Sequence, residues 1–126
     1  MRLAQASFDS PRAPLDAYGD GGFRIGGEFR AGSLLVLPQG AEAWPVSDAA
    51  RLAEAPLGAI LAQKEEIELL LVGTGADIRP LPKSLALALQ AAGIRFEVMS
   101  TRAAARTYNV LLSEDRKVAA ALLAVD

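Results

Sequence analysis

The sequence predicts a layered α/β domain in which a parallel core follows an antiparallel, glycine-rich hairpin. Three observations support this prediction. Residues 67–72 form an almost continuous apolar run, which is typical of a strand covered on both faces. A glycine turn and a helix-periodic segment follow that run directly. Beyond residue 93 the chain shows a strand pattern, then a helix pattern, then a further segment that we interpret as a strand. This order predicts crossover connections between parallel strands.

Length and composition limit the chain to one packed, water-soluble unit. The 126 residues are about one domain long, and 52% are hydrophobic against 22% charged, which favours a globular core over disorder. The formal net charge is −2, and Lys and Arg are scattered, so we expect no nucleic-acid partner. The longest apolar run, residues 118–125, is far shorter than the ~20 residues of a spanning helix, so the protein should not span a membrane.

The chain contains neither Cys nor His. Without Cys there is no disulfide framework, thiol nucleophile or thiolate metal site. Without His the usual general base and the commonest zinc ligand are missing as well. Most familiar hydrolase and oxidoreductase sites are therefore excluded, and we expect no catalytic residues, no metal and no cofactor.

The amino-terminal part divides into an arm and a hairpin. Residues 1–14 hold two prolines among small and polar residues, and we expect a flexible arm that leaves residues 15–126 as a single domain. Within residues 15–27 an aromatic residue lies on either side of Gly19, Asp20, Gly21 and Gly22. Glycines there supply the positive φ angles of a hairpin turn, so two antiparallel strands are predicted.

A second apolar strand is predicted at residues 33–37, where Pro38 ends it. Residues 43–46 should form a third strand at a sheet edge, because Pro45 cannot donate a hydrogen bond to a ladder. A short helix follows potential N-cap residues at positions 47 and 48, and another helical turn is expected before the charged residues 64–66.

The carboxyl-terminal half shows clear periodicity. Apolar residues at helical spacing over 81–92 predict a helix, and Gly93 suits a left-handed C-cap. Residues 94–99 alternate apolar and charged side chains, which predicts a half-buried strand. A further helix is expected over 102–112. The last segment, 117–125, is ambiguous between helix and strand, and we interpret it as a strand.

The turn at Gly73, Thr74 and Gly75 is the first place to look for a ligand, because loops leaving the carboxyl ends of parallel strands usually bind them. The turn does not match the dinucleotide-binding fingerprint. Ile78 occupies the third glycine position, and two prolines delay the helix, so amide groups would not converge on a phosphate. Glu97, the only acid near the ribose-binding distance, lies inside the next predicted strand.

A second polar cluster lies on the helix predicted over 102–112. Arg106 and Asn109 share a helix face and could present a cation and an amide together. In the structural interpretation, which we favour, Tyr108 packs in the core and Asn109 holds a neighbouring backbone. Should this helix lie across the sheet from the glycine turn, both clusters would line one cleft for a ligand or partner, made of Gly73, Thr74, Gly75, Asp77, Arg79, Arg106, Tyr108 and Asn109.

Several stretches together resemble one known family. These stretches are residues 17–27, 33–38, 69–82, 92–99 and 101–123. Their most specific parts are the G-T-G turn and the R-T-Y-N segment. The family is the domain-of-unknown-function family 498/598, which includes mitochondrial NADH:ubiquinone oxidoreductase (complex I) assembly factor 3 and uncharacterised bacterial proteins. The resemblance implies a three-layer α/β/α domain with a mixed, mainly parallel sheet beside a β-hairpin, and it implies a strand for the last segment. It brings no established catalytic residue.

Two functional hypotheses follow. The first is a protein-interaction module, non-catalytic and cofactor-free, whose partner is a respiratory-complex assembly intermediate as the resemblance implies. The second is an enzyme or small-molecule-binding protein that uses the cleft at Gly73, Thr74 and Gly75. The chain has no amino-terminal extension like that of the mitochondrial member, so a bacterial, cytoplasmic protein is expected, as a monomer or homodimer.

Overall fold

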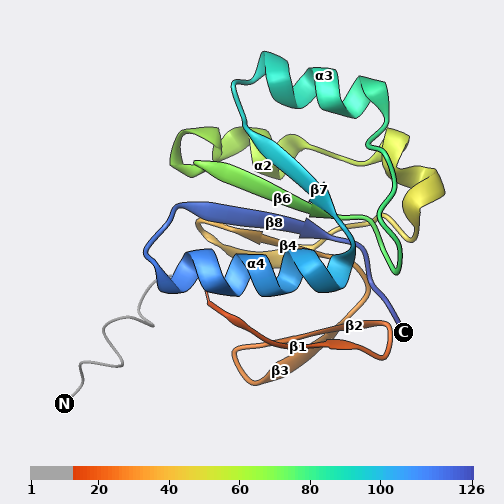
Figure 1. Cartoon of the computed structure of the whole chain (residues 1–126), viewed down its shortest axis with the longest axis vertical. Coiled ribbons are helices and arrows are strands. Elements are labelled where there is room, and N and C mark those ends of the chain that lie inside the picture. Colours follow the sequence, from red (N-terminus) through yellow and green to blue (C-terminus); the bar gives the residue numbers. More distant parts are fainter. Residues whose placement is uncertain (1–12) are drawn as a thin grey trace.

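A computed structural model describes residues 13–126, which form two β-sheets and their covering helices (Figure 1). The predicted arm falls almost entirely on residues 1–12, outside the described residues. The first strand begins at Leu15, where the predicted domain begins.

The smaller sheet is antiparallel and has three strands, β1 (Leu15–Gly19), β2 (Gly22–Ile25) and β3 (Glu28–Ala31). The predicted hairpin between β1 and β2 is confirmed, and Asp20 and Gly21 in its turn have φ angles of 55° and 77°. Strand β3 was not predicted. All four of its residues are exposed, so it shows no alternation of buried and exposed side chains to signal a strand.

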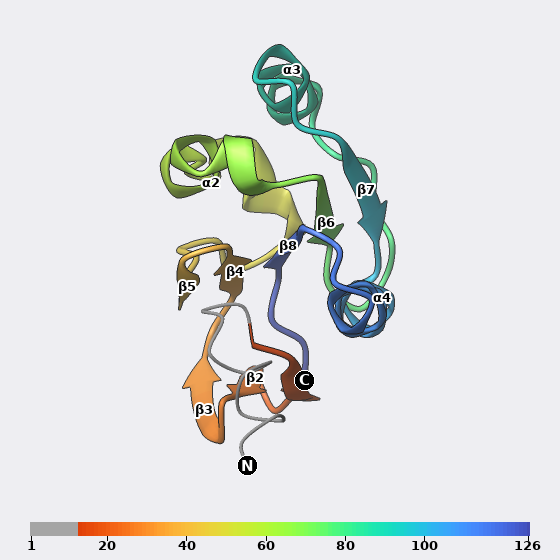
Figure 2. The ribbon, with the colours of Figure 1, turned by 90° about the vertical axis from the view of Figure 1, so that its left-hand side faces the viewer.

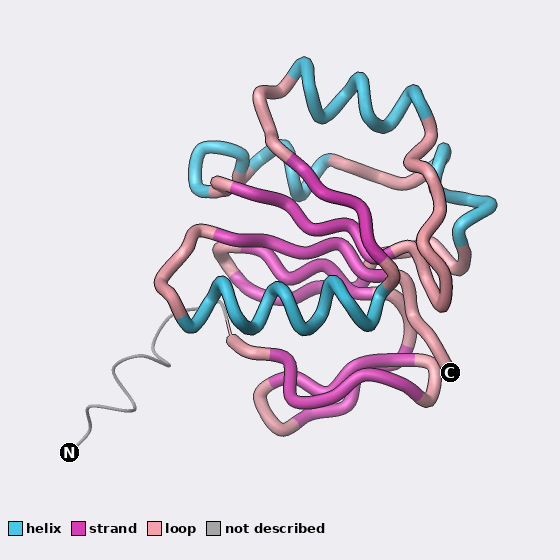
Figure 3. Tube along the Cα trace, in the orientation of Figure 1, coloured by secondary structure: helices cyan, strands magenta, loops and turns pink. Residues whose placement is uncertain are grey.

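The larger sheet is mixed and has five strands in the order β5-β4-β8-β6-β7. β6 pairs in parallel with both β7 and β8, whereas β4 is antiparallel to β8 and β5. Figure 3 shows the strands in magenta, with the helices around them in cyan. The predicted mixed α/β architecture is therefore confirmed. The strands are β4 (Leu34–Leu37), β5 (Gly40–Ala43), β6 (Leu69–Gly73), β7 (Phe96–Met99) and β8 (Val118–Leu122).

Two details of this sheet differ from the sequence-based prediction. The edge strand beside β4 is β5, which shares only Ala43 with the predicted strand at residues 43–46. Beyond Ala43 the strand ends, because the Trp44 indole is buried and its Nε1 donates to the Pro56 carbonyl at 3.0 Å. In addition, β6 is an interior strand, but the middle position belongs to β8, which is buried along its whole length.

Other elements cover both faces of the large sheet (Figure 2), and each face supports one hydrophobic core. On β4, Leu35 and Leu37 face one core and Leu34 and Val36 the other, as strand geometry requires. The 3₁₀-helix η1 (Ala49–Glu54) and the helices α2 (Gly58–Ala62) and α3 (Lys83–Ala91) cover the first face. Helix α4 (Thr101–Ser113) and the small sheet cover the second. A short 3₁₀-helix, η2 (Lys64–Glu66), leads into β6.

Local signals in the sequence set the ends of the two longer helices. Gly93 has a φ of 76°, the left-handed conformation predicted for it after α3. Ser100 is the N-cap of α4, and its Oγ accepts a hydrogen bond from the Ala103 amide at 3.3 Å. Because α4 begins directly after β7, its first turn lies at the carboxyl end of the parallel strands, beside the glycine turn.

Candidate functional site

Gly73 lies where β6 meets the first turn of α4. A Cβ at this position would lie 2.9 Å from Thr101 Cα and 3.0 Å from Leu122 Cδ2. Any other residue would therefore push β6 away from α4 or from β8. The first glycine of the turn allows close packing between layers, and no open space for a ligand lies at its Cα.

Two threonine hydroxyls tie the turn together. Thr101 Oγ1 is fully buried, donates to the Leu123 carbonyl at 2.7 Å and accepts from the Gly75 amide at 2.9 Å. Thr74 Oγ1 accepts from the Arg79 amide at 2.9 Å and lies 2.8 Å from the Asp77 carbonyl. Each hydroxyl thus uses its donor and an acceptor on the backbone. Both hydroxyls are therefore occupied by the protein itself.

The residues that follow the turn, 76–80, form an exposed loop, and Thr74 Oγ1 is hydrogen-bonded to the backbone on either side of its middle residue. We call it the 76–80 loop. Its middle residue, Ile78, has 65% of its surface exposed, and the charged residues Asp77 and Arg79 flank it. An open hollow of about 390 Å³ lies beside the loop and is lined by Asp48, Ala49, Ala50, Arg79 and Pro80.

Tyr108 and Asn109 join α4 to β1. Tyr108 is fully buried, and its hydroxyl donates to the Ala13 carbonyl at 3.1 Å. The Asn109 carboxamide binds both backbone groups of Leu15, accepting from its amide and donating to its carbonyl, each at 2.8 Å. The structural interpretation of this cluster is therefore confirmed. Arg106 is exposed on the same helix.

The two predicted clusters lie at different positions along α4. Thr101 contacts the glycine turn, whereas Asn109 lies eight residues later, about 12 Å further along the helix axis. The reason is geometric, since α4 begins at the turn and runs away from it. The structure brings Gly73, Thr74, Gly75, Asp77 and Arg79 together, and it places Tyr108 and Asn109 against β1 instead.

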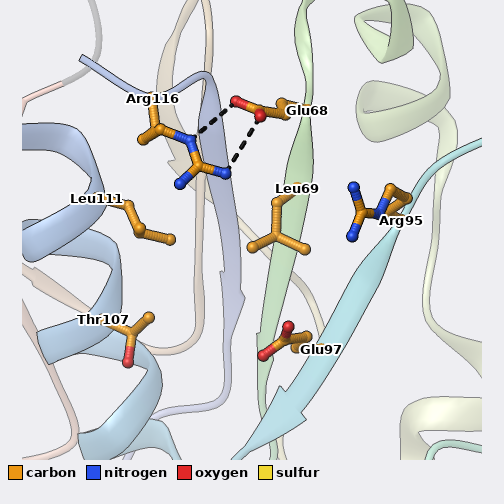
Figure 4. A pocket seen from close by; sticks show the side chains of 7 residues that line it. All are labelled: Glu68, Leu69, Arg95, Glu97, Thr107, Leu111 and Arg116. Atoms are coloured by element: carbon orange, nitrogen blue, oxygen red, sulfur yellow. Dashed lines mark hydrogen bonds and ion pairs between the residues drawn. The ribbon is translucent and has the colours of Figure 1, made fainter. Parts of the chain in front are cut away.

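A pocket of about 280 Å³ opens at the opposite end of β6 (Figure 4). It lies where β6 and β7 begin, beneath the second half of α4, and it is lined by Glu68, Leu69, Arg95, Glu97, Thr107, Leu111 and Arg116. Sequence reasoning missed it because the residues come from four segments. One signal was present, however: charged residues precede or begin two adjacent parallel strands, whose starting ends must lie together.

The charges in this pocket are largely balanced. Arg116 Nε and Nη2 donate to the two carboxylate oxygens of Glu68 at 3.2 and 3.1 Å. These hydrogen bonds hold the pKa of Glu68 below its ordinary value of 4.5 and raise the pKa of Arg116. Both side chains are nearly half exposed, so solvent screens the pair. Arg95 and Glu97 add one further charge of each sign.

Residues 13–126 hold neither a metal-binding cluster nor a membrane-spanning helix. Within this range no three Asp or Glu residues are grouped so that they could hold a metal ion. None of the helices in the same range is long and apolar enough to cross a membrane.

This arrangement defines a mixed α/β domain with two covered faces, and solved bacterial structures share it. A protein described as an outer membrane protein from Bartonella henselae is 42% identical, with a TM-score of 0.80, over 93% of this chain and 99% of that chain. The Rpa2829 protein from Rhodopseudomonas palustris is 40% identical, with a TM-score of 0.77, over 92% of this chain and 87% of that chain.

The chain belongs to the family described as protein of unknown function DUF498/DUF598, whose profile matches residues 15–123. An uncharacterized protein of Rhodobacter capsulatus is 48% identical to it over 87% of this chain and 83% of that protein. NADH dehydrogenase (ubiquinone) 1 alpha subcomplex assembly factor 3 of Bos taurus is 31% identical over 97% of this chain and 67% of that protein. The family resemblance in the sequence is confirmed.

Proposed function

We propose that this chain is a non-catalytic interaction factor that binds an assembly intermediate of a respiratory complex. The name of the bovine relative motivates the choice of partner, because that protein resembles nearly the whole of this chain. The observation that supports a protein partner most directly is the 76–80 loop, which presents Ile78 to solvent from a fixed backbone.

The loop has the properties of a protein-binding element. Hydrogen bonds from and to Thr74 Oγ1 hold it in one conformation, so little conformational entropy would be lost on binding. Ile78 can fill an apolar pocket of a partner, and Asp77 and Arg79 can pair with charges at its margin. The adjoining hollow, with Ala49, Ala50 and Pro80 in its lining, offers room for one side chain of the partner in return.

The same geometry argues against a small ligand at the turn. Atoms of Thr101 and Leu122 fill the space beside Gly73, and the Thr74 hydroxyl already has backbone partners. The pocket at the opposite end of β6 is about 280 Å³, which is near the lower end of the usual ligand-site range of about 300–1,000 Å³. Its balanced charges favour neither an anionic nor a cationic ligand.

Affinity purification from the native host, after gentle membrane solubilisation, tests this proposal. We expect the tagged protein to recover subunits of a respiratory complex, identified by mass spectrometry. Ile78→Asp should lose these subunits, because a carboxylate would have to enter the partner's apolar pocket. Leu87→Asp is the matched control, since Leu87 is 54% exposed on α3, and it should retain them.

Two results would contradict the proposal. One is recovery of no respiratory subunit above the untagged background. The other is equal recovery by the wild type and Ile78→Asp. We also place the protein in the cytoplasm, and cell fractionation that recovers it with the outer membrane would overturn that location.

A further inference from the structure

Strand β7 is an edge of the large sheet, and one side of its backbone is unused. The carbonyls of Arg95 and Met99 accept hydrogen bonds from the amides of Leu70 and Thr74, so the odd-numbered residues point toward β6. Because backbone direction alternates along a strand, the N–H and C=O groups of Phe96 and Val98 point outward. In the part of the chain that the structure describes, β7 pairs with no strand except β6.

The two edges of this sheet differ in how they are protected. β5 follows Pro38 closely and is itself followed by Pro45, and proline blocks the addition of a further strand. β7 contains no proline, and its register with β6 runs without interruption. Figure 2 shows β7 at the margin of the sheet, with α3 and α4 on opposite faces. The edge is therefore suited to accept another strand.

The charges beside this edge specify which strand it would accept. Arg95 and Glu97 alternate with Phe96, and both line the pocket on the α4 side of the sheet (Figure 4). If two copies of β7 pair antiparallel about Phe96, Arg95 of each copy lies opposite Glu97 of the other. Both cross-strand pairs are then attractive. We propose that the chain forms a symmetric homodimer through β7, joining two five-stranded sheets into one continuous sheet.

Backbone and side-chain geometry agree with this register. The outward groups of Phe96 would exchange two hydrogen bonds with their copies in the other chain, and Val98 N–H would reach the Ile94 carbonyl. Arg95 and Glu97 would then form a non-hydrogen-bonded pair, in which side chains approach most closely. On the α3 side, an open hollow of about 460 Å³ borders Phe96 and Ile94, which leaves room for the second phenylalanine.

The dimer does not depend on the proposed function, because the 76–80 loop and the outer edge of β7 are different surfaces. The strand is only four residues long, so we expect a reversible dimer with a dissociation constant in the micromolar range. Its test is the oligomeric state of the full chain, measured by sedimentation velocity over a concentration series up to about 1 mM.

Charge reversal tests the register itself. Arg95→Glu or Glu97→Arg alone places like charges opposite one another twice, and each should weaken the dimer about tenfold or more. The double variant Arg95→Glu/Glu97→Arg restores opposite charges and should restore the wild-type constant. Glu42→Arg, on the exposed part of β5, is the control and should change nothing. Thermal unfolding of each variant confirms that it folds.

Amide hydrogen exchange gives an independent measure. At concentrations where the dimer dominates, the Phe96 and Val98 amides should be protected, and dilution should remove the protection. A chain that remains monomeric to about 1 mM would overturn the proposal. So would a dimer that the single reversals leave unchanged, or one that the double reversal fails to restore.

Discussion

The carboxamide of Asn109 binds both backbone groups of Leu15, each at 2.8 Å. One side chain of α4 therefore substitutes for a missing strand at the start of β1. Together with the Tyr108 hydroxyl on the Ala13 carbonyl, it fixes the small sheet to the face of the large one. These contacts join residues that are 94 and 95 positions apart in sequence, so they are a long-range clamp between α4 and the start of the small sheet.

Asn109→Asp should destabilise the protein by about 1–3 kcal/mol. The substitution keeps an acceptor for the Leu15 amide but replaces the donor with a carboxylate oxygen that repels the Leu15 carbonyl. The measurement is the free energy of unfolding in urea. Val110→Ala is the control, because Val110 is 55% exposed on the next position of the helix, and it should have little effect. Equal stability of Asn109→Asp and wild type would show that the clamp is dispensable.

Gly73→Ala should cost about 1–3 kcal/mol, because the new Cβ would lie 2.9 Å from Thr101 Cα and overpack the contact between β6 and α4. Gly58→Ala is its control. Gly58 begins α2 with no atom near the added Cβ, so alanine there should be neutral or slightly stabilising. Chemical denaturation of both variants makes the comparison. If both alanine substitutions changed the free energy of unfolding equally, close packing would not be the reason why glycine is needed at position 73.

Much of the fold could be predicted because local pattern and burial agree over residues 67–126. The apolar run of β6, the spacing of Leu85 and Leu89 in α3, and the capping Gly93 each determine local structure directly. The order of the strands in the sheet could not be predicted in this way. β8 lies between β4 and β6, although it is the last strand in the chain, and no periodicity within β8 indicates its neighbours. Strand pairing depends on long-range packing that local patterns do not contain.

The candidate site, like the fold, could be predicted from the sequence only in part. The contacts of Gly73, Thr74 and Gly75 follow from a turn that must pass close to a helix, and sequence pattern located that turn correctly. Helical spacing placed Arg106 and Asn109 on one face, but it could not say that Asn109 binds the backbone of β1. That outcome depends on where α4 begins relative to β6, which only the assembled sheet determines.

Thr101→Val tests whether the buried hydroxyl stabilises the turn. Valine preserves the shape of the side chain but leaves the Gly75 amide and the Leu123 carbonyl without this partner. We expect a loss of about 1–3 kcal/mol in the free energy of unfolding. Thr101→Ser retains the hydroxyl and should lose less, about the value of one buried methyl group. A serine variant less stable than the valine variant would assign the role of Thr101 to packing instead.

The ion pair between Glu68 and Arg116 should make a small pH-dependent contribution to stability. The Arg116 hydrogen bonds hold the folded-state pKa of Glu68 below its ordinary value of 4.5. The pair therefore stabilises the protein above pH 4.5, and this stabilisation is lost as the pH falls through the lowered pKa. Glu68→Gln should therefore have a lower melting temperature than the wild type near neutral pH, and the two should converge in acid. Both partners are nearly half exposed, so the difference should be small and should shrink in 1 M salt, where the Debye length is about 3 Å.

Glu65→Gln is the control, because Glu65 is exposed in η2 and forms no ion pair among residues 13–126. A difference between Glu68→Gln and wild type that persisted unchanged into acid would have to come from packing of the side chain and not from its charge.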